Sequence, residues 1–387
     1  MSLDTGGGRA NTGALRTSSG TVSLGRTISS AGEGLVAEIA DRPATAVKIF
    51  HALASGAGLL SVNRRPEERL RKVAVMAELP PPARVQADGH VVLAWPEELV
   101  YEGDVAVGYT MPRIAWTRTM ELHELVKIRH GARVPAHIPA WAPTFAFRNR
   151  VHTAVNLCRA VEVVHSTGAI IGDFNERNIL VDETARVSLV DTDSMQFIAP
   201  DGELFTCDVG HRDYTAPELL GHDLALTRRG AEADHFALAV HIHRLLLGGL
   251  HPFLGGEWTA GVHRPAAIEL ARAGHYVGGP RSPLAPTSRH PDPRRLPTPV
   301  RELFDRAFRL GALRPLDRPG PAEWVTVLER LRGRGQAHSA KPDRARRDRP
   351  NPTGPDATGP DATGPDATGP DATGGQTRPG RAERDAG

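Results

Sequence analysis

Four polar residues near the middle of the 387-residue sequence stand at spacings that suit phosphoryl chemistry. The segment IGDFNERNILVDETARVSLVDTDSM carries Asp173, then Asn178 five positions later, and then Asp191 and Asp193. Carboxylate and amide oxygens are the ligands that Mg²⁺ prefers, and a carboxylate off the metal can orient a hydroxyl. We therefore expect Asp173 to orient an attacking hydroxyl, while Asn178 and Asp191 hold the metal. Asp and Asn also stabilise turns, so the pattern alone leaves a structural role open.

Phosphoryl chemistry also needs a cation, and the earlier stretch TAVKIF supplies one. The stretch is typical of a strand and carries Lys48 in its middle, two residues after Ala46. The later stretch RRPEERLRKVAVMAEL predicts a helix, because Pro66 suits a first turn and apolar residues recur at helical spacing. Glu67 or Glu68 is the natural partner of the lysine, and Glu67 is favoured. A surface lysine on an edge strand is the structural alternative.

A glycine-containing turn, SSAGEGLVAE, precedes that strand. Glycine has no side chain, so such a turn lets backbone N–H groups approach a phosphate closely. Gly32 and Gly34 are accordingly candidates for covering a nucleotide. An ordinary hairpin turn has the same composition, so it remains an alternative.

The elements that must position these residues change character along the chain. Strand-like runs separated by turns dominate the first part, and helical patterns such as RNRVHTAVNLCRAVEVVHSTG dominate the second. This order predicts an α+β fold. Residues 1–20 and 336–387 are expected to be disordered, because they are rich in small and polar residues. The second segment also holds consecutive Gly-Pro-Asp-Ala-Thr repeats.

Three further motifs follow in order. An Ala-Pro-Glu triplet ends at Glu218, Asp234 opens a long helical stretch, and Arg318 stands near the end. A buried glutamate needs a cation, and Arg318 is suited to a bidentate pair with Glu218. Asp234 is a candidate for holding the backbone of the loop that carries Asp173.

As a set, these motifs resemble the eukaryotic-like protein kinase superfamily over residues 21–333. The spacing from Asp173 to Asn178 is that of its catalytic loop, and Ala46 with Lys48 matches its third strand. The resemblance implies a protein kinase that uses ATP and Mg²⁺.

The resemblance also implies a bilobal protein-kinase-like fold, with a β-rich N-lobe at 21–113 and an α-helical C-lobe at 114–335. It adds two residues of the stretch GYTMPRI to the cofactor-binding set. That set becomes Gly32, Gly34, Val36, Ala46, Lys48, Glu67, Met111 and Arg113.

Stretches such as AWPEELVYEG and GDFNERNIL are similar to one divergent bacterial branch of the superfamily. Its members are encoded beside a metal-dependent protein phosphatase and a von Willebrand A-domain protein of the tellurium-resistance type. The resemblance implies protein substrates, with these two proteins as candidate partners.

The catalytic loop departs from the family pattern. Ile171 and Gly172 stand where His and Arg are usual, so the usual reader of a phosphorylated activation loop is missing. Asn175 replaces the lysine two residues after Asp173. Arg177 is therefore a candidate for the missing catalytic cation.

The metal motif departs as well, since Asp-Thr-Asp at 191–193 replaces Asp-Phe-Gly. Asp193 is either a second metal ligand or bonded locally to backbone. The changes retain the four groups that the chemistry most needs, which are Lys48, Asp173, Asn178 and Asp191.

Composition argues against several other classes of protein. The formal net charge of +2 gives no bulk signal for nucleic acid, and no such partner is expected. Cys158 and Cys207 are too few for a disulfide framework or a cysteine-rich zinc site. No signal segment and no stretch long enough to cross a membrane is evident, so a cytoplasmic protein without a membrane partner is expected.

Three functions stay open on the sequence. The first is an ATP- and Mg²⁺-dependent protein kinase acting on Ser or Thr hydroxyls. The second is a pseudokinase scaffold that binds nucleotide without turnover. It is suggested by the altered metal motif and by Ser29 and Ala31, which stand where the family's glycine loop has its first two glycines. The third is a small-molecule kinase of the aminoglycoside or choline type, which predicts neither the Ala-Pro-Glu triplet nor the helix that Asp234 opens. The full set of motifs favours the protein kinase.

Overall fold

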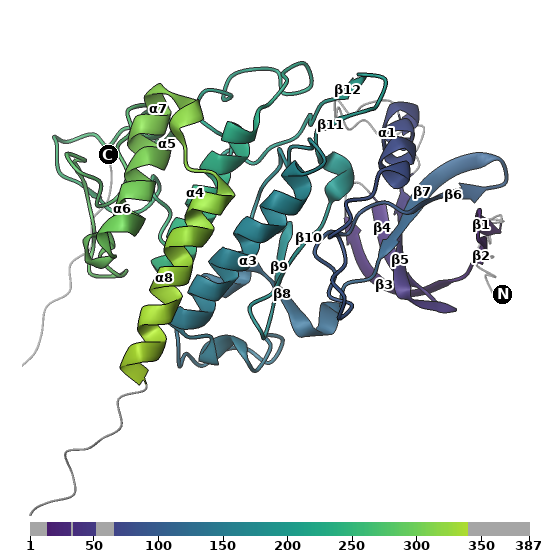
Figure 1. Cartoon of the computed structure of the whole chain (residues 1–387), viewed down its shortest axis with the longest axis horizontal. Coiled ribbons are helices and arrows are strands. Elements are labelled where there is room, and N and C mark those ends of the chain that lie inside the picture. Colours follow the sequence, from purple (N-terminus) through teal and green to yellow (C-terminus); the bar gives the residue numbers. More distant parts are fainter. Residues whose placement is uncertain (1–13, 32–33, 52–65, 340–387) are drawn as a thin grey trace, which may run out of the picture. The chain divides into compact units, whose positions relative to one another are not determined.

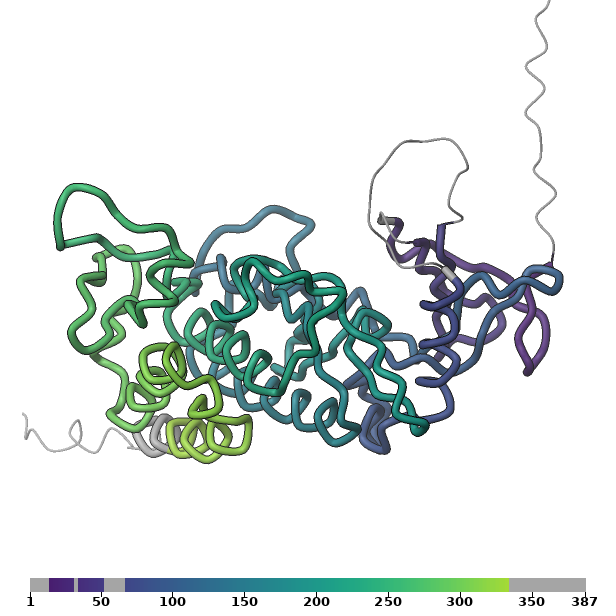
Figure 2. The backbone as a smooth tube through the Cα atoms, turned by 90° about the horizontal axis from the view of Figure 1, so that it is seen from above, coloured from purple at the N-terminus to yellow at the C-terminus, as the bar shows by residue number. Residues whose placement is uncertain are grey.

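The computed structural model describes residues 14–31, 34–51 and 66–339. A strand-rich group of elements is followed by a helix-rich group (Figures 1 and 2). The α+β class and the two-part, kinase-like arrangement that the sequence predicts are both confirmed. Gly32 and most of the tail expected to be disordered lie outside the described residues.

The first group is an antiparallel sheet with one helix packed on it. In the described residues the sheet has seven strands in the order β2-β1-β6-β7-β5-β4-β3, and α1 contacts β6 and β7. The elements are β1 (Leu15–Thr17), β2 (Gly20–Val22), β3 (Leu24–Ala31), β4 (Gly34–Ile39), β5 (Arg42–Phe50), α1 (Pro66–Glu78), β6 (Glu98–Glu102) and β7 (Val105–Pro112).

The sheet begins earlier than the sequence predicts. Residues 15–17 form β1, which pairs with both β2 and β6, although disorder is expected through residue 20. Leu15 packs against the small core that contains Val22 and Val100. One of its two partner strands, β6, lies far away in the chain, so the polar composition of residues 15–17 does not reveal the strand.

The second group is built around α3 and α4, and α3 also packs against α8 (Figure 1). Both α3 and α4 are buried along most of their length, which their continuous apolar runs explain. The helices are α2 (Leu122–Leu125), α3 (Phe147–His165), α4 (Ala231–Leu246), α5 (Ala267–Arg272), α6 (Thr298–Asp305), α7 (Gly311–Leu313) and α8 (Pro321–Ser339). The strands are β8 (Thr119–Glu121), β9 (Ile179–Asp182), β10 (Val187–Leu189), β11 (Phe197–Ile198), β12 (Leu204–Phe205), β13 (Glu257–Trp258) and β14 (Leu284–Ala285).

Two further features concern the chain's later part. β9 and β10 pair as an antiparallel hairpin between Asn178 and Asp191. The last helix, α8, continues to Ser339, beyond the boundary at residue 335 that the sequence predicts. Among the described helices, each is too short or too polar to cross a membrane.

Candidate active site

The centre of the candidate site is a group of charged side chains where β5 meets the segment after β10. β5 places Lys48 opposite Val36 of β4 and Tyr109 of β7. Lys48 Nζ lies 2.7 Å from Asp191 Oδ1 and 2.8 Å from Asp193 Oδ1. Burial alone would lower the pKa of Lys48, but the two aspartates outweigh it and raise that pKa above its usual range. The lysine is therefore charged, and it lies beside the predicted metal motif.

Asp193 is fully enclosed, and both of its oxygens accept hydrogen bonds. Oδ1 accepts from Lys48 and, at 2.6 Å, from the Tyr109 hydroxyl, while Oδ2 accepts from Arg69 Nη2 at 2.6 Å. Lys72 of α1 donates to the Asp193 carbonyl at 2.7 Å. Burial raises the pKa of Asp193, but Lys48 and Arg69 outweigh it and hold that pKa well below its usual range. Asp193 is thus the shared anion of two cations, which does not favour the metal-ligand role left open above.

The helix supplies a different partner from the one that the sequence predicts. Glu67 is exposed in the first turn of α1, and the ion pairs of Lys48 with described residues are made to the two aspartates instead. Arg69, Lys72 and Met76 share the inward face, at the spacings of three and four that define one side of a helix. Glu67 lies off that face. Helical phase counted from the buried Met76 is the signal that identifies Arg69.

An apolar cluster adjoins the lysine on the same face of the sheet. Ala46, Tyr109 and Met111 are buried, and Val36 and Val190 pack against them. Alternation along β5 places Ala46 and Lys48 on one face, two residues apart. A largely apolar surface beside a cation is suited to binding a nucleotide, which has a flat base and anionic phosphates.

Two other predicted cofactor residues have structural contacts of their own. A Cβ on Gly34 would collide with the carbonyl oxygen of Ile49, so β4 can approach β5 closely only with glycine there. Arg113 donates its amide to Ala44 O at 2.8 Å and its guanidinium to Glu38 at 2.8 Å. Its cationic end therefore points to Glu38 and not to the apolar cluster.

Asp173 is held by hydrogen bonds on both carboxylate oxygens. Oδ1 accepts from the His211 amide at 3.0 Å, and Oδ2 accepts from Asn175 Nδ2 at 3.0 Å. Burial raises the pKa of Asp173 above its usual range, partly offset by these two hydrogen bonds and by the charge of Arg229. A fixed carboxylate with a raised pKa is suited to accepting a hydrogen bond from a hydroxyl.

Asn178 and Asp191 offer the oxygens that a magnesium ion needs. Asn178 Nδ2 donates to the Asp173 carbonyl at 3.1 Å, and its amide oxygen meets no donor among the described residues. Asp191 is a quarter exposed and has a left-handed backbone with φ of 58°. Such a conformation is costly for a residue with a side chain and is concentrated at functional sites.

The described residues contain no group of three or more His, Cys, Asp or Glu side chains placed to hold a metal alone. Magnesium that is shared with nucleotide phosphates needs only one or two protein ligands. The donor set of Asn178 and Asp191 therefore fits that mode of binding.

Arg177 does not take the position expected for a catalytic cation. Its guanidinium lies 3.5 Å from Glu121 and 3.4 Å from His123, and it is largely exposed. Among the described contacts of Arg177, none is with Asp173. The side chain that contacts the Asp173 carboxylate is Asn175, and the sequence did not predict this contact.

Two structural roles predicted from the sequence are confirmed. Asp234 accepts hydrogen bonds from the amides of Ile171 at 2.8 Å and Gly172 at 3.1 Å, so it holds the backbone of the loop that carries Asp173. Buried Arg318 makes a bidentate pair with Glu218, with N–O distances of 2.6 and 2.8 Å.

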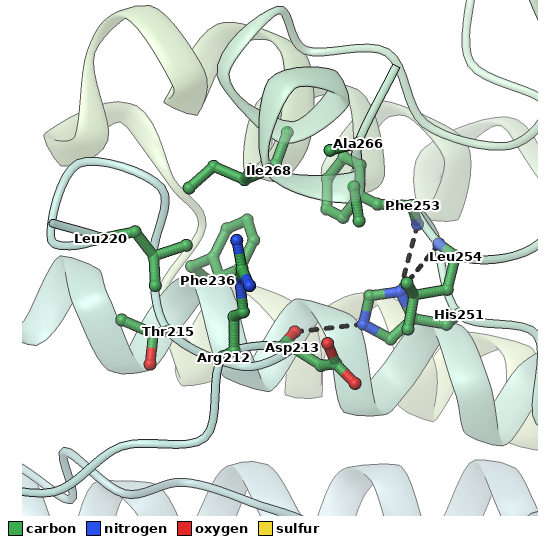
Figure 3. A pocket seen from close by; sticks show the side chains of 12 residues that line it. Arg212, Asp213, Thr215, Leu220, Phe236, His251, Phe253, Leu254, Ala266 and Ile268 are labelled. Atoms are coloured by element: carbon green, nitrogen blue, oxygen red, sulfur yellow. Dashed lines mark hydrogen bonds between the residues drawn. The ribbon is translucent and has the colours of Figure 1, made fainter. Parts of the chain in front are cut away.

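A cavity of about 290 Å³ lies close to this loop along the chain (Figure 3). Arg212 lines the cavity, and it directly follows His211, whose amide donates a hydrogen bond to Asp173. Apolar side chains line it from the segment before α4, from α4, from the loop after α4 and from the region of α5. Figure 3 labels Leu220, Phe236, Phe253, Leu254, Ala266 and Ile268 among them.

A family model described as "Protein kinase domain" matches residues 139–272. The sequence is 28% identical over 318 residues to "Protein kinase YegI" of Escherichia coli O157:H7, and 28% identical over 316 residues to the protein of that name in strain K12. Each alignment covers 80% of this chain, but the chain spans only 45% and 44% of those relatives.

A more limited similarity links the chain to a mammalian protein. It is 30% identical over 158 residues to a "PAS domain-containing serine/threonine-protein kinase" of Mus musculus. That alignment covers 38% of this chain and 11% of the mouse protein.

Proposed function

We propose that the chain is an ATP- and Mg²⁺-dependent protein kinase that phosphorylates Ser or Thr hydroxyls, a proposal supported by the match of residues 139–272 to a protein kinase domain and by the similarity to the two Escherichia coli protein kinases. The observation that carries the proposal is the 2.7 Å contact between Lys48 and Asp191, residues 143 positions apart. A lysine on a strand, a metal motif and an orienting carboxylate form the set that phosphoryl transfer requires.

In this proposal the nucleotide binds to the strand-rich first group of elements. The apolar cluster around Ala46 and Met111 packs against the adenine, and the Lys48 ammonium binds phosphate oxygens. Asp193 keeps the ammonium in place, because it bonds Lys48 from a fully buried position. Lys48 then exchanges its bond with Asp191 for the phosphates and retains Asp193.

The metal falls to Asn178 and Asp191, each of which presents an oxygen. A magnesium ion held by these two oxygens would neutralise charge on the phosphates. Asp193 stays outside the metal shell, since its oxygens are taken by Lys48, Tyr109 and Arg69.

The hydroxyl falls to Asp173. Its carboxylate accepts the hydrogen bond of the incoming Ser or Thr hydroxyl and orients the oxygen toward the phosphorus. Asn175 and the His211 amide hold the carboxylate at the required angle.

Proteins are the proposed substrates. The segment that binds Asp173 through His211 continues into the apolar cavity lined by Leu220, Phe236 and Ile268, which can receive a side chain of a bound peptide. A Ser/Thr preference is supported by the similarity to the serine/threonine-protein kinase of Mus musculus. A metal-dependent phosphatase and a von Willebrand A-domain protein as partners, and a cytoplasmic location, are parts of the proposal that rest on the sequence resemblance.

The test is transfer of labelled γ-phosphate from ATP to the protein itself and to a panel of protein substrates. Lys48→Met should abolish transfer, while Lys127→Met, at an exposed lysine, should leave it intact. Wild-type protein that binds ATP with Mg²⁺ but transfers no phosphate would point to the pseudokinase instead. Transfer to aminoglycosides or choline but not to proteins would point to a small-molecule kinase.

A further inference from the structure

A buried arginine from outside the catalytic loop occupies the space beside Gly172. Arg229 lies just before α4 and is 3% exposed. Its Nη2 donates to the carbonyl oxygens of Cys207 at 2.9 Å and Val209 at 2.6 Å. A Cβ on Gly172 would lie 2.8 Å from Arg229 Nη1 and 2.7 Å from Cys207 Sγ. Any side chain at position 172 would therefore compete with the guanidinium for its place.

The backbone of Arg229 is fixed by a second buried residue. The side-chain amide of Gln196 donates to Arg229 O and accepts from Arg229 N, each at 2.8 Å. Gln196 in turn exchanges backbone hydrogen bonds with Ile170 at the start of the catalytic loop. Arg229 is thus anchored to the loop on one side and reaches the segment at 207–209 on the other.

The segment that Arg229 grips leads directly to the catalytic carboxylate. Two residues after Val209, the His211 amide donates to Asp173. The guanidinium contacts backbone carbonyls, which are present whether or not any side chain of the segment is modified. The position of the segment therefore needs no added phosphate in order to be held.

We propose that Arg229 is a positioning residue that keeps the 207–211 segment docked on the catalytic loop without phosphorylation of that segment. The inference rests on the proposed kinase function. In this proposal Arg229 anchors the 207–211 segment, which Gly172 of the catalytic loop cannot do because it has no side chain. The proposal also explains Gly172, whose φ of +71° and crowded surroundings leave no room for a side chain.

The test compares Arg229→Met with Arg228→Met, because Arg228 is the exposed neighbour of the same charge. Amide hydrogen exchange is followed in peptides that cover 205–213 and 170–175. Arg229→Met should speed exchange in both peptides about tenfold or more, the scale expected for losing hydrogen bonds from a charged donor. Arg228→Met should leave both unchanged. Equal exchange in the two variants would overturn the proposal, even if the protein proves to have no kinase activity.

The kinetic arm separates positioning from general damage. Arg229→Met should lower kcat about tenfold or more while changing the KM for ATP less than about threefold. Arg229→Lys keeps the charge and should recover part of kcat, and it also replaces the Met variant if that one does not fold. Wild type treated with a phosphatase should keep its activity. A comparable fall in kcat after phosphatase treatment, reversed by rephosphorylation, would overturn the proposal.

Discussion

Lys48 on β5 and Asp193, 145 positions later in the chain, form an ion pair with an N–O distance of 2.8 Å. The same carboxylate binds Arg69 of α1, so the helix contributes a cation where the sequence predicts a glutamate. The anion that holds the lysine therefore comes from the metal-motif segment. One buried carboxylate thus links α1 to both the lysine and that segment.

The first prediction concerns the buried charge of Asp193. Asp193→Asn leaves Lys48 and Arg69 close together without their shared anion, so the free energy of unfolding should fall by about 3–5 kcal/mol. Denaturant unfolding monitored by circular dichroism measures it. Asp41→Asn, at an exposed aspartate, is the control and should stay within about 0.5 kcal/mol of wild type. A loss for Asp193→Asn no larger than the control's would show that the pair is not structural.

The second prediction separates the two helix residues. Glu67→Gln removes an exposed charge that is not part of the Lys48 cluster, so ATP affinity and kcat should stay within about twofold of wild type. Arg69→Met removes a cation bonded to Asp193 and should reduce kcat about tenfold or more. Calorimetric ATP titration and steady-state kinetics decide between them. The account is wrong if Glu67→Gln proves the more damaging change.

The third prediction is a pH dependence set by Asp173. The carboxylate must be ionised to accept the hydroxyl's hydrogen bond, and burial raises its pKa. The acidic limb of the kcat/KM profile should therefore lie above the range of an ordinary aspartate. Charged or titratable groups that act on it are His211 and Arg229, beside the neutral donor Asn175.

Asn175→Ala provides the directional check on that profile. The Asn175 hydrogen bond stabilises the ionised carboxylate, so its removal should move the acidic limb to higher pH. A limb that stays in place or moves to lower pH would rule out Asp173 as the group that titrates.

The fourth prediction concerns acid stability. His241 and His243 are fully buried, and burial lowers the pKa of each to about 4; burial lowers the pKa of His251 to about 3. The unfolded chain takes up protons below about pH 6.5, whereas these folded residues stay neutral until about pH 4. The free energy of unfolding should therefore fall as pH drops from 6.5 to 4, by up to about 1.4 kcal/mol per pH unit for each histidine.

Thermal unfolding measured across that pH range tests the histidine prediction. On the acid side, His241→Gln should reduce the slope of the free energy of unfolding against pH by the contribution of one proton. His263→Gln, at an exposed histidine, should leave that slope unchanged. An unchanged slope in His241→Gln would mean that the residue is protonated in the folded protein.

The features that the sequence could predict are those that depend on residues close together in the chain. The spacing of Asp173 and Asn178, and the strand around Lys48, are visible because period and turn residues are local signals. The failures depend on contacts between distant segments. The sequence favours Glu67 and does not identify Arg69, because the phase of α1 is fixed by the residues that the helix packs against. Gly172 and Arg229 are far apart in the sequence, so the sequence does not reveal that the Arg229 guanidinium occupies the space beside Gly172.

A second kind of failure concerns segments that have no regular structure of their own. The stretch HVVLAWPEELV is typical of a single strand, yet β6 starts only at Glu98. Val92, Leu93 and Trp95 are instead buried in the core that contains α3 and α4. Apolar residues in a short run report burial, and they do not distinguish a strand from a packed loop.

The most direct measurement of the central claim compares wild type with Asp173→Asn for transfer of labelled γ-phosphate to protein, with ATP binding measured on the same samples. The account predicts that Asp173→Asn loses transfer by about 10²-fold or more and binds ATP with Mg²⁺ as wild type does. Transfer by Asp173→Asn at the wild-type rate would contradict it.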